Sequence, residues 1–149
     1  MASRLEVIQV GVEFYGDQSH PSAIVIRSNT AVPGIEFFSP PDFSQQIGLM
    51  TRAAGHIVPA HVHNTIERTI FHTQEVLVIR KGVCKVTLYD SRLHISSEIV
   101  ISSGDTILLA SGGHQIEMLE ETEILEVKQG PYAGANDKTH LDLKNDSSQ

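Results

Sequence analysis

The sequence predicts an all-β domain, a sandwich or a barrel with little or no helix. Short runs rich in β-branched residues recur along the chain, and Gly, Asp, Asn or Pro residues separate them. No stretch carries a sustained helical period with caps at both ends. The chain has 149 residues, of which 40% are hydrophobic, so it has the usual size of one domain with a real core.

The first half of the chain is expected to form short strands with irregular connections. Pro40 and Pro41 end one of them, because proline cannot donate to a ladder. Residues Asn64–Phe71 are the one helix candidate and form either a single turn or a loop. The expected strands are Leu5–Val10, Ala23–Ile26, Ile35–Phe38, Ile47–Arg52 and Ile57–His63.

The second half of the sequence predicts a more regular pairing of strands. We expect a tight hairpin through Lys81 and Gly82 and a last hairpin around Glu120 and Glu121. The expected strands are Gln74–Ile79, Val83–Tyr89, Leu93–Ile101, Thr106–Ala110, Gln115–Leu119 and Glu123–Val127. Residues 1–130 are therefore assigned to one barrel with N-terminal strands, and residues 131–149, which lose hydrophobic periodicity, to a partly disordered tail.

Charge and composition exclude several classes of function. The formal charge is −7 and the basic residues are scattered, so no nucleic-acid partner is expected. No apolar run is long enough to cross a bilayer, and the N-terminus lacks the apolar stretch of a signal peptide, so we expect no membrane partner and a cytoplasmic location. The single cysteine, Cys84, excludes an internal disulfide and is predicted to be a small core residue.

Four side chains that bind metals occupy suggestive positions. His61 and His63 are two apart and share one face of any strand they occupy. Glu75 and His114 each open another β-rich run. Adjacent strands lie about 4.8 Å apart, which lets ligands from three strands reach one ion at metal–nitrogen distances near 2.1 Å. Imidazole and carboxylate together suit a divalent transition metal such as Fe, Mn, Ni or Zn.

These residues resemble the two motifs of the cupin superfamily. The first motif, G-x5-H-x-H-x3-4-E-x6-G, is matched by Gly55, His61, His63, Glu75 and Gly82. The second, G-x5-P-x-G-x2-H-x3-N, is matched approximately by Gly104, Gly112 and His114. The resemblance implies a double-stranded β-helix (a jelly-roll or cupin barrel), metal ligation by His61, His63, Glu75 and His114, and a homodimer. An edge for such a dimer is available on Leu5–Val10 or on the tail after Pro131.

The chain departs from the cupin motifs at three places. Ala110 stands where the second motif has proline, and Met118 stands where it has asparagine. The spacer between His63 and Glu75 is longer than usual, and Glu67 lies at the normal distance after His63. The carboxylate ligand is therefore Glu75 or Glu67, and we favour Glu75 because it keeps its distance to Gly82.

The resemblance implies a metal-dependent enzyme acting on a small oxygenated molecule, a sugar or an acid, as in cupin dioxygenases and isomerases. His72 or Glu67 is the acid or base candidate. Arg68 and Lys128 are candidates for holding the substrate, since cationic side chains bind carboxylates and phosphates. The alternative is a non-catalytic module that binds a metal or a small ligand. Fold alone does not choose between the two functions.

Overall fold

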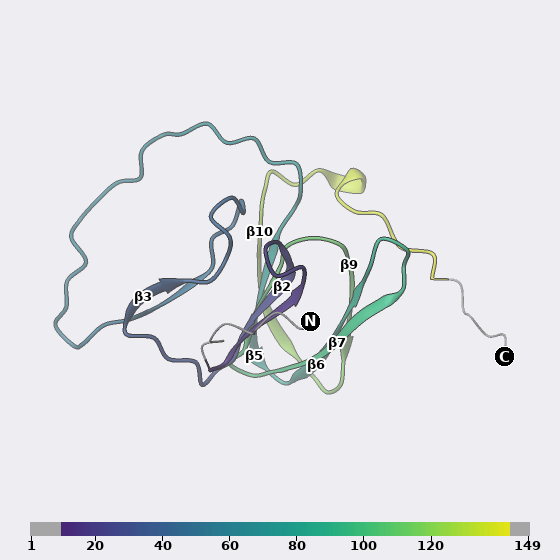
Figure 1. Cartoon of the computed structure of the whole chain (residues 1–149), viewed down its shortest axis with the longest axis horizontal. Coiled ribbons are helices and arrows are strands. Elements are labelled where there is room, and N and C mark those ends of the chain that lie inside the picture. Colours follow the sequence, from purple (N-terminus) through teal and green to yellow (C-terminus); the bar gives the residue numbers. More distant parts are fainter. Residues whose placement is uncertain (1–9, 144–149) are drawn as a thin grey trace, which may run out of the picture.

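The computed structural model describes residues 10–143 and shows a small all-β protein with antiparallel sheets (Figure 1). A five-stranded sheet has the order β1-β2-β8-β5-β10, a three-stranded sheet the order β7-β6-β9, and β3 pairs with β4 alone. No sheet closes into a barrel. The strands are β1 (Val12–Gly16), β2 (Pro21–Ile26), β3 (Gly34–Phe37), β4 (Gly48–Thr51), β5 (Glu75–Lys81), β6 (Val83–Tyr89), β7 (Ile95–Ser102), β8 (Thr106–Leu109), β9 (Gly113–Met118) and β10 (Glu123–Lys128).

The hydrophobic core lies between the two larger sheets. Alternate residues of β5 and β8 face those of β6 and β7, and they include Ile79, Ile107, Val86 and Ile101, all almost fully buried. Cys84 is buried in the same cluster, as the sequence predicts, and burial raises the pKa of its thiol. The alternation of apolar residues along each strand thus places one face of each sheet in the core.

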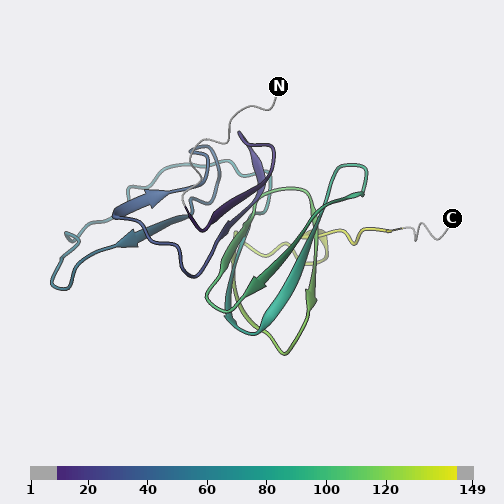
Figure 2. The same ribbon diagram turned by 60° about the horizontal axis from the view of Figure 1, so that its bottom comes forward.

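A second apolar cluster covers the other face of the five-stranded sheet. It joins Val12, Ile24 and Leu108 to Ile47, which precedes β4. Strands β2 and β8 are therefore buried on both faces, which explains their nearly continuous apolar sequences. The β3–β4 hairpin lies on this outer side, away from the three-stranded sheet (Figure 2).

Two predicted hairpins are wrong, because the chain changes sheets at both places. Strand β5 pairs with β8 and β10, whereas β6 pairs with β7 and β9, so Gly82 leads from one sheet to the other. Gly82 has a φ of +87°, and a Cβ there would lie 2.3 Å from the Glu121 carbonyl oxygen. The second connection, from β9 to β10, crosses between the sheets in the same way.

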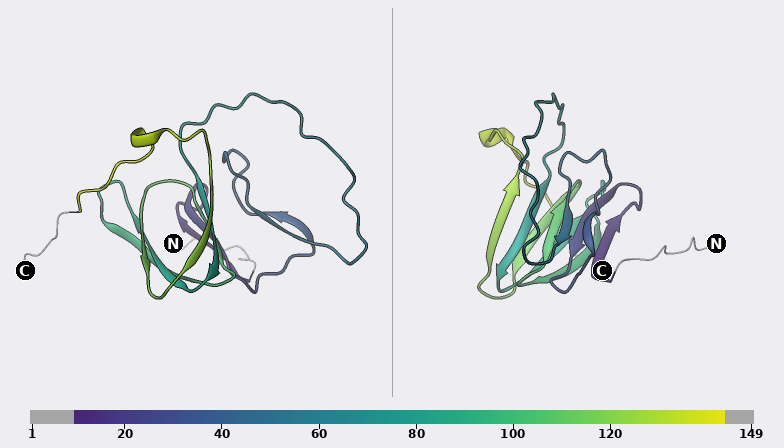
Figure 3. Two further views of the ribbon diagram at one scale, coloured as in Figure 1. Left: turned by 180° about the vertical axis from the view of Figure 1, so that it is seen from behind. Right: turned by 90° about the vertical axis from the view of Figure 1, so that its left-hand side faces the viewer.

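The expected strand Ile57–His63 is wrong as well. The connection between β4 and β5 has no helix or strand, and we call residues 52–74 the β4–β5 segment. It arcs outward beside β3, on the side away from β9, in both the front and the rear views (Figure 1 and Figure 3). The stretch Asn64–Phe71 is loop rather than a helical turn.

The remaining differences lie at the ends of the chain. The expected first strand, Leu5–Val10, lies outside the described residues except for Val10, which is in a turn. Strand β1 is not among the strands that the sequence predicts. The chain after β10 contains one short 3-10 turn, Gly134–Asn136. Within residues 10–143 there is no helix with the length and apolar character needed to span a bilayer.

Candidate functional site

Glu75 and His114 come together at one end of the two sheets. Glu75 is the first residue of β5, in the five-stranded sheet, and His114 is the second residue of β9, in the three-stranded sheet. The Oε2 atom of Glu75 lies 3.3 Å from the Nε2 atom of His114. Both side chains are partly accessible, with 20% and 33% of their surface exposed. Two of the four predicted metal ligands are therefore neighbours.

A pocket of about 150 Å³ opens beside this pair. Its lining residues are Thr73, Glu75, Leu109, Ser111, Gly112, His114, Asp137 and Lys138. Leu109 is directly opposite Glu75 in the β5–β8 register, so it forms an apolar wall next to the carboxylate. The pocket is smaller than most ligand sites, which measure about 300–1,000 Å³, but several polar groups converge in it.

The electrostatics of the pocket favour an ionised carboxylate. The contact with His114 is the main cause that lowers the pKa of Glu75, and the positive charges of Lys128 and Lys138 lower it further. Partial burial acts in the opposite direction. Glu75 is therefore a negatively charged oxygen donor at neutral pH.

The structure places the other two predicted ligands elsewhere. His61 and His63 lie in the exposed β4–β5 segment with their ring centroids 5.3 Å apart. The Nδ1 atom of His61 is 2.8 Å from the carbonyl oxygen of Pro59. Among residues 10–143, no group of three or more His, Cys, Asp or Glu side chains has the geometry to hold a metal ion.

The donor chemistry nevertheless fits a divalent transition metal. One carboxylate and one imidazole at 3.3 Å can share an ion, and each is a common ligand of Zn and related metals. Two protein ligands are fewer than the three or four found in most zinc sites. Full ligation would require His61 and His63 to move to the pair.

The remaining predicted site residues lie apart from the pair. His72 lines a different pocket of about 290 Å³, together with His20 and Asp42, whose Nε2 and Oδ2 atoms are 2.8 Å apart. Arg68 lines a third pocket beside residues 41–46. Glu67 is exposed, and no ion pair joins it to Arg68 in the part of the chain that the structure describes.

Lys128 is close to the site but is already engaged. It lies opposite Glu75 in the β5–β10 register, and its Nζ atom is 3.0 Å from the Oδ2 atom of Asp137. Lys128 does not line the pocket, whereas Asp137 and Lys138 do, and no sequence pattern points to these two residues. A tail without periodicity carries no signal for such contacts.

No protein-family model, no curated protein and no solved structure matches this chain. The chain is a small all-β protein with antiparallel sheets, and no homologue identifies it as a cupin. The resemblance to cupins therefore rests on the motif residues alone.

Proposed function

We propose that this protein binds one divalent transition metal at Glu75 and His114, with His61 and His63 as the other two ligands. The observation that carries the proposal is the contact between Glu75 and His114, two residues from different sheets that meet in a pocket. A partly buried carboxylate beside an imidazole is a ready pair of metal donors. Glu67, the alternative carboxylate, is exposed and does not line the pocket.

The proposal requires the β4–β5 segment to fold against the three-stranded sheet. Strand β9 ends that sheet, so one of its edges is open to a further strand. Residues 57–63 have no backbone hydrogen bond to the rest of the described chain that would have to break first. Pairing along β9 would place His61 and His63 near His114 and would extend the sheet toward the closed jelly roll that the motifs imply.

The best-supported activity is a metal-dependent reaction of a small oxygenated substrate, such as an oxygenation or an isomerisation. A bound metal would act there as a Lewis acid toward substrate oxygens. His72 and Glu67 remain the acid or base candidates because they lie on the same segment as His61 and His63 and would move with it.

The second candidate is a non-catalytic module that binds a metal or a small ligand. It is favoured by the separation of His72 and Glu67 from the pocket that contains Glu75 and His114. Neither of these two predicted acid or base candidates lines the pocket of Glu75 and His114 in the described structure. Turnover of a substrate by zinc-, manganese- or iron-loaded protein separates the two functions.

Metal stoichiometry tests the binding site directly. The purified chain is stripped with a chelator, dialysed against Zn²⁺ and measured by elemental analysis. We expect about one zinc per wild-type chain and much less in His61→Ala, His114→Ala and Glu75→Gln. The matched control His94→Ala removes an imidazole outside the proposed site and should retain the metal. Glu67→Gln tests the alternative carboxylate and should retain the metal as well.

The variants also give the outcomes that contradict the proposal. Full zinc binding by both His114→Ala and Glu75→Gln would show that the metal lies elsewhere. Loss of zinc in Glu67→Gln with retention in Glu75→Gln would assign the carboxylate ligand to the β4–β5 segment instead.

A further inference from the structure

The chain after β10 contributes Asp137 and Lys138 to the lining of the pocket beside Glu75 and His114. We call residues 131–143 the C-terminal strap. Lys138 and the strap residues that follow it line a neighbouring pocket with the first residues of β9. A Cβ on Gly113 would lie 2.6 Å from the Cδ1 atom of Leu141, so the glycine lets the strap approach β9 closely. The strap is therefore seated on the site rather than projecting from it.

One ion pair fixes the strap near the site. The Nζ atom of Lys128 lies 3.0 Å from the Oδ2 atom of Asp137, whose side chain is only 10% exposed. The same Nζ atom lies 5.5 Å from the centre of the Tyr132 ring, at the start of the strap. The contact with Asp137 is the main cause that raises the pKa of Lys128. Lys128 thus acts as an anchor, and Asp137 balances its charge.

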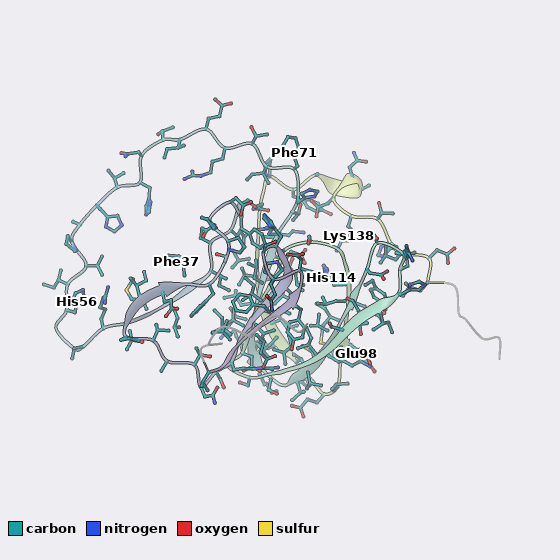
Figure 4. The ribbon with its side chains drawn as sticks, in the orientation of Figure 1. Phe37, His56, Phe71, Glu98, His114 and Lys138 are labelled. Atoms are coloured by element: carbon teal, nitrogen blue, oxygen red, sulfur yellow. The ribbon has the colours of Figure 1, made fainter. Side chains whose placement is uncertain are left out.

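Lys138, the residue after Asp137, differs from Lys128 in forming no ion pair within residues 10–143. Its side chain lines the same pocket as Glu75 and His114, and it lies beside His114 in the side-chain view (Figure 4). Within residues 10–143, no carboxylate lies within ion-pair distance of Lys138. An exposed cationic side chain that lines a pocket and forms no ion pair there is suited to bind an anionic ligand.

We propose that Lys138 binds the carboxylate group of a short organic acid whose other end lies against Glu75 and His114. A pocket of about 150 Å³ has the size of a cavity that holds benzene, so it accommodates a ligand of about six non-hydrogen atoms. Glu75 lines the same pocket and repels negative charge on a ligand, so a singly charged carboxylate fits better than a phosphate dianion. The inference rests on the proposed use of this pocket as a ligand site and holds with or without the metal.

Glycolate is a suitable probe because it has one carboxylate and one hydroxyl on a two-carbon chain. Its affinity is measured by isothermal titration calorimetry at neutral pH, with inorganic phosphate titrated in parallel. We expect Lys138→Gln to bind glycolate about tenfold more weakly than the wild type, and Lys138→Arg to retain most of the affinity. The control Lys81→Gln removes a lysine at the other end of β5, where Glu121 pairs with it, and should bind like the wild type.

Several results overturn the assignment of Lys138. These are no measurable glycolate binding by the wild-type chain, equal affinity in Lys138→Gln, or tighter binding of phosphate than of glycolate. The titration is run on chelator-treated and on zinc-loaded protein, with the zinc content of each variant measured. Lys138-dependent glycolate binding in a chain that takes up no zinc would leave this inference standing while the proposed metal site fails.

Discussion

His114 and Glu75 are 3.3 Å apart because β9 and β5 begin at the same end of two facing sheets. Each residue lies at the start of its strand, where the core side chains give way to the pocket. Leu77 and Ile79, which follow Glu75 along β5, are packed in the core and hold the strand in place. The packing of the core therefore sets the distance between the two donors.

The first prediction compares the same substitution, isoleucine to alanine, inside and outside this core. Ile79 is 1% exposed between the sheets, whereas Ile57 on the β4–β5 segment is 81% exposed. We expect Ile79→Ala to lower the free energy of unfolding by about 2–5 kcal/mol, because it removes buried methyl groups and leaves a cavity. Ile57→Ala in metal-free protein should change it by less than about 0.5 kcal/mol.

Urea unfolding followed by circular dichroism measures both values. A loss in metal-free Ile57→Ala as large as that in Ile79→Ala would show that the segment is packed against the core without a metal. Equal, small effects of both substitutions would contradict the position of the core itself.

The second prediction concerns Asp105, a buried carboxylate in the turn before β8. Its oxygens accept hydrogen bonds from the backbone N–H groups of Ser28 (2.8 Å) and Ser102 (3.0 Å), and from the Nη1 atom of Arg27 (3.1 Å). Asp105→Ala leaves these donors without their acceptor and the Arg27 charge with one partner fewer. We expect a loss of about 2–4 kcal/mol in the free energy of unfolding.

The control for Asp105 is Asp90→Ala, since Asp90 accepts hydrogen bonds only within its own exposed turn. Its urea midpoint should stay much closer to the wild-type value. If the Asp105 variant were as stable as this control, the hydrogen bonds to the Asp105 carboxylate would contribute nothing to the stability of the fold.

The third prediction concerns the pH dependence of stability through Glu13. The side chain of Arg27 donates Nε and Nη2 hydrogen bonds to the two carboxylate oxygens, at 2.7 and 2.9 Å, and this contact lowers the pKa of Glu13 below its ordinary value. The folded chain then binds fewer protons at this site than the unfolded chain. The resulting stability is present above the ordinary pKa and is lost as the pH falls through the lower folded value.

We therefore expect Glu13→Gln to flatten the loss of stability between about pH 5 and about pH 3. The urea midpoint as a function of pH measures this slope, and Glu36→Gln on the exposed side of β3 serves as the control. A slope for Glu13→Gln as steep as that of the wild type would show that the pair with Arg27 contributes nothing to acid sensitivity.

The sequence predicts most of the strands, because alternation of apolar residues is a local signal. Residues Val83–Tyr89 are expected and found as one strand, and the other strands of the second half agree within a few residues. Pairing is not local, however. The turn at Gly82 is compatible with a hairpin and with a connection between two sheets. The packing of β5 and β6 into opposite sheets decides between these two possibilities.

The candidate site is predictable only in part for the same reason. His114 and Glu75 follow turns before apolar strands, so the sequence points to them. Lys138 lies in a stretch without periodicity, and its place at the pocket depends on the contact between Lys128 and Asp137. The position of His61 and His63 depends on the segment that contains them. Its alternating residues form a strand only if that strand can pair with an open sheet edge.

The fourth prediction concerns this segment. Side chains from Ile57 to Phe71 are exposed in the described structure, and several are large and apolar, which is unusual for a free loop. If zinc brings His61 and His63 to Glu75 and His114, the backbone amides of residues 57–63 should become protected from hydrogen exchange. We expect protection of at least about tenfold on adding zinc, as for newly paired strand amides.

Hydrogen exchange followed by mass spectrometry measures this protection, and the double variant His61→Ala/His63→Ala should not show it. Protection of residues 57–63 that is already complete without zinc would mean that the segment pairs with the sheet independently of the metal. Protection by zinc in the double variant would mean that the two histidines do not hold the segment in place.

An anomalous difference map of zinc-loaded crystals at the zinc absorption edge shows whether Glu75, His114, His61 and His63 hold one metal ion. We expect one strong peak per chain between Glu75 and His114, with the two histidine nitrogens of the β4–β5 segment about 2.1 Å from it. A peak elsewhere, or a peak at this position that lacks both His61 and His63 as ligands, would show that these four residues do not form one metal site.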